Sequence, residues 1–145
     1  MKRTFPLLAT LLALAGCGGG DKTATDADAV RATLSTFATA VEKRDYQRLC
    51  DEVFAPELLR GLQGIGLPCE IAMKTSLGEV REPKLTVGAV TVKGRTAQAQ
   101  IKTSAAGQPP STDAITLTKV GKRWQVSGLG GAPGASPTPS ATPSP

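Results

Sequence analysis

Three cysteines are the residues of this sequence with the most informative chemistry. Cys17 ends a region that begins with the apolar run Phe5–Ala15 and is followed by three glycines, whereas Cys50 and Cys69 lie within the rest of the chain. Histidine is absent from all 145 residues, and the cysteine spacing fits neither a zinc site nor a CxxC redox pair. The cysteines therefore indicate covalent modification or cross-linking.

The first sixteen residues have the pattern of a bacterial lipoprotein signal peptide. A positive start, Met1–Arg3, precedes eleven apolar or nearly apolar residues over Phe5–Ala15, too few for a membrane-spanning helix of about 20 residues. Leu14-Ala15-Gly16-Cys17 resembles a lipobox, in which the cysteine thiolate receives diacylglycerol. Ordinary secretion with cleavage after Ala15 is the alternative. We expect Cys17 to carry fatty acyl chains such as palmitate, which anchor the chain stably when two or more are present.

Lipidation of Cys17 would leave Cys50 and Cys69 as a pair. An exported location permits a disulfide between them, and closing that segment would stabilise the fold by about 3 kcal/mol in the chain-entropy model. Two buried, reduced thiols are the alternative. Both cysteine predictions require export, so we expect an extracytoplasmic protein on the outer face of the cell membrane.

Acid–base chemistry has few candidate residues. Because histidine and asparagine are both absent, the remaining candidates for a general acid or base are Tyr46, Glu57, Glu70 and Asp113. Glu57 suits the first turn of a helix, where a carboxylate is stabilised in any case, and the helical spacing of Tyr46 fits a core position. No two acids share a predicted strand face. We therefore expect no catalytic residues, with a small enzyme as the alternative.

Motifs for metals, nucleotides and nucleic acids are missing. The segment GLQGIG over 61–66 lies between predicted helices, not after a strand, and so lacks the context of a phosphate loop. Nucleic-acid binding would also need aromatic residues among the basic ones. We expect no metal, no cofactor and no nucleic-acid partner. A solvated rim or attraction to an anionic membrane or wall polymer explains the basic residues at hairpin ends, namely Lys93, Arg95, Lys119, Lys122 and Arg123.

The first half of the remaining chain has helical periodicity. Apolar residues spaced by four, three and four predict one helix from Asp26, with Asp26 or Asp28 as its cap. Asp45 is placed as the N-cap of a second helix, Pro56 opens a third, and a fourth covers about Pro68–Leu77. The face of the first helix comprises Val30, Leu34, Phe37 and Val41.

After Pro83 the apolar period becomes two, which predicts strands. The first strand covers Leu85–Val92 with a bulge near Gly88, a turn over 93–95 leads to a second, and a loop over 107–110 precedes a third at Asp113–Val120. A turn at Gly121 and Lys122 leads to the last strand, Arg123–Ser127. Helices followed by an antiparallel meander predict an α+β fold with the helices on one face of the sheet.

The chain ends in the segment GGAPGASPTPSATPSP, which contains no large apolar residue and cannot offset the entropy of ordering. We expect it to be disordered. The predicted organisation is a signal peptide over 1–16, a flexible tether over 17–27, an α+β domain over 28–129 and a Pro-rich tail over 130–145.

Three segments carry a family resemblance, VEKRDYQRLCDEVF, LPCEIA and KRWQVSGL. With them, the region from about Asp26 to Leu129 resembles the NTF2-like (cystatin-like) lipoproteins of actinobacteria. The resemblance implies a curved sheet and a helical layer that form a cone with a pocket, in a fold that includes isomerases, dehydratases and polyketide cyclases. One departure is the lack of a strand between the early helices.

These features together favour a non-catalytic binding module anchored to the membrane. Its expected partner is a small apolar ligand or another envelope protein, and the candidate pocket residues are Tyr46, Phe54 and Trp124. The alternative is an NTF2-like isomerase, dehydratase or cyclase that uses a pocket carboxylate or tyrosine.

Overall fold

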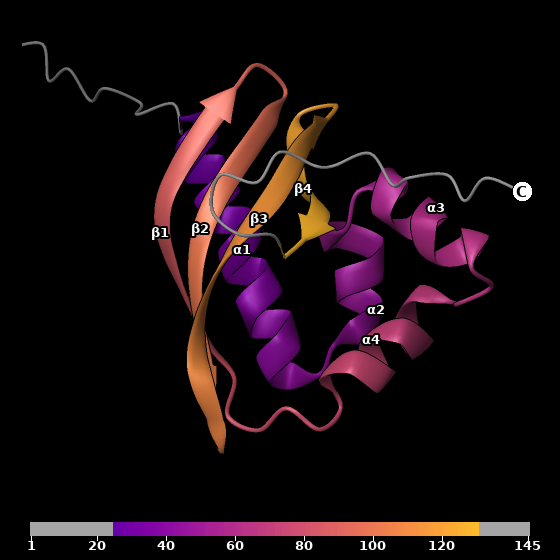
Figure 1. Cartoon of the computed structure of the whole chain (residues 1–145). Helices are drawn as coiled ribbons and strands as arrows, with labels where there is room; N and C mark the ends of the chain where they lie inside the picture. The colour runs from indigo at the N-terminus through magenta and orange to yellow at the C-terminus, as the bar shows by residue number, and fades with distance from the viewer. Residues whose placement is uncertain (1–24, 131–145) are drawn as a thin grey trace, which may run out of the picture.

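The computed structural model describes residues 25–130, so the predicted signal peptide, Cys17 and the segment 131–145 lie outside the described residues. Helices come first and strands second, which confirms the α+β prediction (Figure 1). The helical elements are α1 (Asp26–Lys43), α2 (Tyr46–Arg48), the π-helical turn η1 (Leu49–Val53), α3 (Pro56–Gly64) and α4 (Cys69–Leu77). The strands are β1 (Lys84–Lys93), β2 (Thr96–Ala105), β3 (Gln108–Val120) and β4 (Arg123–Leu129).

A capping box, in which two residues cap each other's backbone N–H groups, begins α1. The Thr25 hydroxyl accepts a hydrogen bond from the Asp28 N–H at 3.2 Å, and the Asp28 carboxylate accepts one from the Thr25 N–H at 3.1 Å. Thr25 is therefore the N-cap, in place of the predicted Asp26 or Asp28. The helix begins two residues before the predicted domain boundary at residue 28, because the cap lies at residue 25.

The predicted starts of the second and third helices are confirmed. Asp45 caps α2 by accepting a hydrogen bond from the Arg48 N–H at 3.1 Å, and Pro56 occupies the first turn of α3. A π-helical turn, which the periodicity did not predict, continues α2 and buries Leu49, Cys50 and Val53. The wider turn keeps these three residues on the interior side of the chain.

The sheet is an antiparallel meander in the order β1-β2-β3-β4. Its register shifts between Val87 and Val90, which confirms the predicted bulge near Gly88. The predicted loop over 107–110 is wrong, because β3 begins at Gln108 and only a tight turn precedes it. β4 pairs with β3 only from Ile115 onward, so the start of β3 is an edge on that side, where proline is tolerated.

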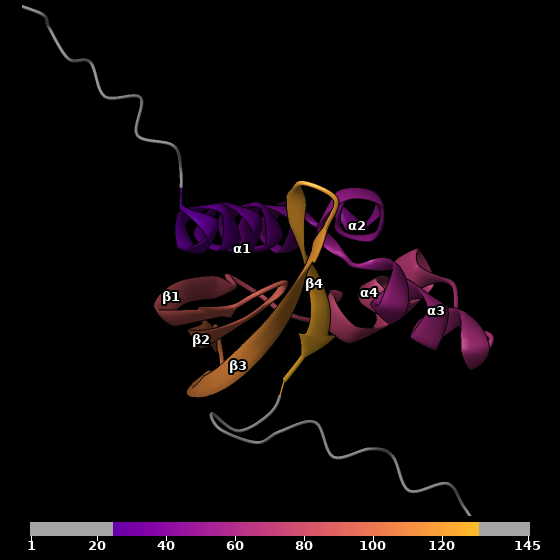
Figure 2. The same ribbon diagram turned by 90° about the horizontal axis from the view of Figure 1, so that it is seen from above.

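Helix α1 lies across one face of the sheet, and α3 and α4 lie beyond β4 (Figures 1 and 2). An isolated parallel bridge between Phe54 and Val126 joins the helical region to the edge strand. Among the described residues, Phe54 is the only residue in the stretch of sequence between the end of α1 and the start of β1 that pairs with a strand. The core lies between α1 and the sheet and includes Val30, Leu34, Leu49, Val53, Phe54, Ala99, Ile115, Leu117, Trp124 and Val126.

A disulfide joins Cys50 of η1 to Cys69 of α4, with their Cα atoms 6.0 Å apart. This confirms the predicted pairing. The cross-link closes the segment that contains α3, a helix with no fully buried residue. Cys50 is itself in the core cluster, so the disulfide ties α4 to the core beside α3, whose Leu58, Leu59 and Leu62 are only partly buried.

Candidate ligand pocket

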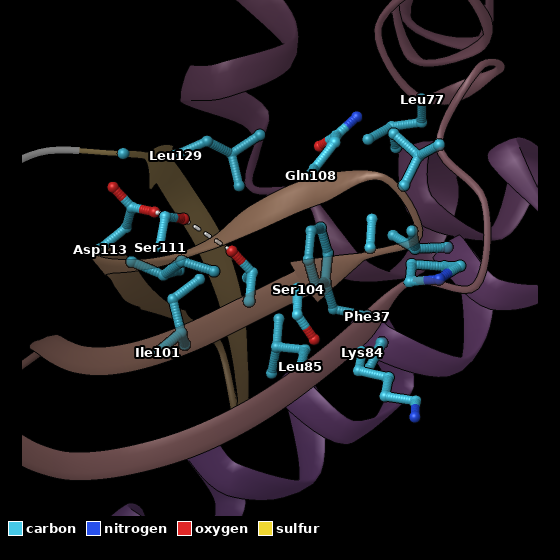
Figure 3. Close-up of a pocket in the computed structure, with 18 of the residues that line it drawn as sticks. Phe37, Leu77, Lys84, Leu85, Ile101, Ser104, Gln108, Ser111, Asp113 and Leu129 are labelled. Carbon is cyan, nitrogen blue, oxygen red and sulfur yellow. Dashed lines mark hydrogen bonds between the residues drawn. The ribbon is translucent and has the colours of Figure 1, made fainter.

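A pocket of about 300 Å³ lies between the C-terminal half of α1, the connection from α4 to β1, and the face of the sheet that α1 covers. Figure 3 shows its lining side chains near the β2–β3 hairpin. Apolar groups dominate the lining. They include Phe37 and Val41 from α1, Leu77, Val80 and Pro83 from the connection, and Leu85, Ile101, Ile115 and Leu129 from the strands.

Strand register determines which side chains reach the pocket. Successive residues of a strand point to opposite faces, so every second residue of β2 and β3 faces α1. Thr103 of β2 pairs with Leu85 of β1 on one side and with Ser111 of β3 on the other. Ile101 pairs with Asp113 one step along. Both rows of paired residues therefore bring apolar and polar side chains to the same wall.

Three polar side chains form a hydrogen-bonded group in this wall. The Ser111 hydroxyl donates to a carboxylate oxygen of Asp113 at 2.7 Å, and the hydroxyls of Thr103 and Ser111 lie 2.8 Å apart. Figure 3 shows Asp113 and Ser111 side by side, and a dashed line marks the contact between the Ser111 hydroxyl and a second hydroxyl of the wall. A mostly apolar pocket with a few convergent polar groups is the usual form of a small-molecule site.

The three aromatic residues proposed from the sequence do not line this pocket. Phe54 and Trp124 are only 1% and 2% exposed, and Tyr46 is half-buried at the start of α2. Phe54 packs behind the pocket, with its ring centroid 6.3 Å from that of Phe37. Trp124 borders a separate depression of about 300 Å³ next to the first half of α1. The pocket instead takes its aromatic ring from Phe37, which the sequence analysis placed on the inner face of its helix.

The four candidate acid–base residues are separated by the fold. Asp113 lines the pocket, whereas Glu57 and Glu70 are exposed in the first turns of α3 and α4. Sequence reasoning did not identify Thr103 and Ser111. The alternation of Ser111, Asp113 and Ile115 is a strand signal, but Pro109 and Pro110 directly before it favoured a loop.

Part of the predicted basic rim has structural partners. Arg95 donates to the Lys119 carbonyl oxygen at 2.8 Å, and the Lys119 ammonium donates to the Asp26 carboxylate at 2.6 Å. These contacts join the turn after β1, the end of β3 and the start of α1. Two of the five basic residues are therefore held within the fold.

Two further features are missing from residues 25–130. No group of three or more cysteine, aspartate or glutamate side chains is arranged to hold a metal ion there. None of the helices in that range combines the length and the hydropathy needed to cross a membrane.

Comparison with known proteins gives structural neighbours only. No family model matches the chain, and no curated protein matches it. An NTF2-like protein of unknown function from Shewanella baltica is 19% identical, with a TM-score of 0.49 over 68% of this chain and 85% of that one. One from Silicibacter pomeroyi is 20% identical, with a TM-score of 0.47 over 68% and 87%. The de novo designed NTF2 fold protein NT-9 is 12% identical, with a TM-score of 0.49 over 72% and 85%.

The α+β assignment rests on the helices and strands of this chain itself. Fold and site together define a small α+β domain with an apolar pocket between one helix and an antiparallel sheet.

Proposed function

We propose that this chain is an extracytoplasmic lipoprotein of NTF2-like type, anchored at Cys17, whose domain binds a small apolar ligand without catalysing a reaction. The pocket beside Phe37 is the observation that carries the ligand-binding part. Its volume of about 300 Å³ lies at the lower end of the range for small-molecule sites, about 300–1,000 Å³. The sequence Leu14–Cys17 supports the anchor.

The composition of the lining favours binding over catalysis. Asp113 is the only acid among the described residues that line the pocket, and its hydrogen-bond partner there is a serine hydroxyl. General acid–base catalysis usually places a group of suitable pKa within reach of the reacting proton. The enzymatic alternative therefore depends on Asp113 alone, since Tyr46 does not line the pocket.

Filling the pocket tests the ligand-binding proposal. Ala105 lines the pocket at the end of β2, and Ala106, the next residue, is exposed and does not line it. We expect Ala105→Phe to weaken binding of the neutral dye Nile red at least about tenfold, because the new ring occupies ligand volume and overpacks the site. Fluorescence titration measures the affinity, with circular dichroism to check folding.

Ala106→Phe is the matched control and should bind the dye as the wild type does. Equal dye affinity in wild type and Ala105→Phe would place the dye elsewhere and contradict the proposal.

A second candidate function is binding of an envelope protein partner. Three large apolar side chains are exposed within the segment 65–71, namely Ile65 at 74%, Leu67 at 37% and Ile71 at 55%. Exposed apolar groups of this kind favour contact with another protein. Dye binding that persists in Ala105→Phe and is lost in Ile71→Ser would favour this candidate over the pocket.

A further inference from the structure

The polar group in the pocket wall has only acceptor capacity left for a ligand. A carboxylate accepts hydrogen bonds and donates none, and a hydroxyl donates a single proton. Ser111 gives its proton to Asp113 at 2.7 Å, so the proton in the 2.8 Å contact between Thr103 and Ser111 must come from Thr103. Both hydroxyl protons are therefore engaged, and lone pairs alone remain.

Among the described residues that line the pocket, no cation is paired with Asp113. Lys84 is the other charged side chain among the described residues that line the pocket. It is the first residue of β1 and is exposed, and Figure 3 shows it on the side of the pocket opposite Asp113. No ion pair joins the two within residues 25–130. Ser111 is exposed and Asp113 is partly exposed, so the negative charge and the acceptor positions of this wall are accessible to a ligand.

We propose, on the basis of the ligand-binding function above, that the pocket selects a small apolar amine in its protonated form. The ammonium group donates to Asp113 and supplies the missing positive charge, since charge-assisted hydrogen bonds are the strong ones. The alkyl or aryl body lies against Phe37, Leu85 and Ile101. A carboxylate or carbonyl at the same place brings only acceptors and is disfavoured.

Three probes with the same eight-carbon chain distinguish the contribution of head-group charge to the binding affinity from that of apolar contact. They are octylammonium, octanol and octanoate, titrated into the purified, oxidised full chain by calorimetry at pH 7 and constant ionic strength. We expect octylammonium to bind about tenfold or more tightly than octanoate, with octanol between them, as one charge-assisted hydrogen bond implies.

Asp113→Asn tests whether the Asp113 carboxylate causes the preference for octylammonium. This nearly isosteric change should reduce the preference for octylammonium over octanoate to less than about threefold, because it removes the charge and introduces donors. Glu70→Gln removes an exposed acid of α4 and should leave the preference unchanged. Should Asp113→Asn fail to fold, Asp113→Thr, which suits a strand, gives the same comparison.

Two outcomes overturn the proposal while ligand binding stands. In the first, octanoate or octanol binds the wild type as tightly as octylammonium or more tightly. In the second, the preference for octylammonium over octanoate persists in Asp113→Asn. Failure of all three probes to bind overturns both this proposal and the ligand-binding function.

Discussion

Asp26 ties the beginning of α1 to the β3–β4 hairpin. Its carboxylate accepts hydrogen bonds from the Lys119 ammonium at 2.6 Å and from the Trp124 indole N–H at 3.0 Å. The Lys119 ammonium also lies 5.7 Å from the Trp124 ring centroid, within range of a cation–π contact. One exposed carboxylate thus connects residues that lie more than ninety positions apart in the sequence.

The hydrogen bond from Lys119, and then that from Trp124, hold the pKa of Asp26 below its ordinary value of 3.8. Because the folded-state pKa lies below that of the unfolded chain, the stabilisation is complete above the unfolded value and is lost as the pH falls through the folded value. The pKa of Asp28 is lowered in the same direction by its hydrogen bonds with Thr25. Stability should therefore decline on acidification below about pH 4.

Asp26→Asn should lower the urea midpoint at pH 7, because the amide loses the ionic part of the contact with Lys119. The difference in midpoint from wild type should begin to narrow as the pH falls below 3.8, where the carboxylate of the unfolded chain becomes neutral. It should disappear once the pH is below the lowered pKa of Asp26 in the folded protein. Urea unfolding at several pH values measures both effects. Asp51→Asn, at an exposed position of η1, is the control. If the difference in urea midpoint between wild type and Asp26→Asn stayed constant with pH, the Asp26 carboxylate would not be the source of the stabilisation.

At the scale of elements, the disulfide holds the outer helices in place. α3 has no fully buried residue, and α4 buries Ala72 and Met73. The cross-link between Cys50 and Cys69 closes a sequence separation of 19 residues, so it restricts the unfolded chain in that part of the fold.

Replacing both cysteines by alanine should lower the free energy of unfolding by about 3 kcal/mol, because the unfolded chain regains its loop entropy. Urea unfolding of the oxidised protein measures the change. Adding a reductant should lower the stability of the wild type by a similar amount and leave the double variant unchanged. A wild type that is insensitive to reductant would show that the bond does not stabilise the fold.

At the scale of the whole molecule, the pocket is assembled from segments that are distant in the sequence. Phe37 comes from α1, Leu77 from the end of α4, and Ile101 and Asp113 from the middle of two strands. The pocket lies between α1 and the sheet near the β2–β3 hairpin. The proposed ligand site and the proposed anchor at Cys17 therefore lie in different parts of the chain.

Cys17→Ser should move the protein from the detergent phase to the aqueous phase in a detergent-partitioning experiment. The physical reason is the loss of acyl chains, each buried methylene of which contributes about 0.8 kcal/mol to membrane binding. Intact-mass analysis of wild type and variant is the accompanying control for the lipid. A Cys17→Ser protein that still partitions into detergent would contradict lipid anchoring at this residue.

Local signals in the sequence determined most of the secondary structure. The four-three-four spacing of Val30, Leu34, Phe37 and Val41 predicted α1, and the alternation after Pro83 predicted the order of the strands. Asp45 and Pro56 marked helix starts correctly because capping and proline geometry act within one turn. The disulfide was predictable because only two cysteines remained once Cys17 was assigned to the lipid.

The tertiary structure alone decided what faces the pocket. Tyr46, Phe54 and Trp124 were equally good candidates by side-chain type, yet Phe54 and Trp124 are buried in the core and Phe37 lines the pocket. The start of β3 depends on pairing with β2 and on where β4 stops, and both are long-range contacts. Periodicity identifies the inner side of each element, but only packing between elements determines whether that side meets another side chain or an open space.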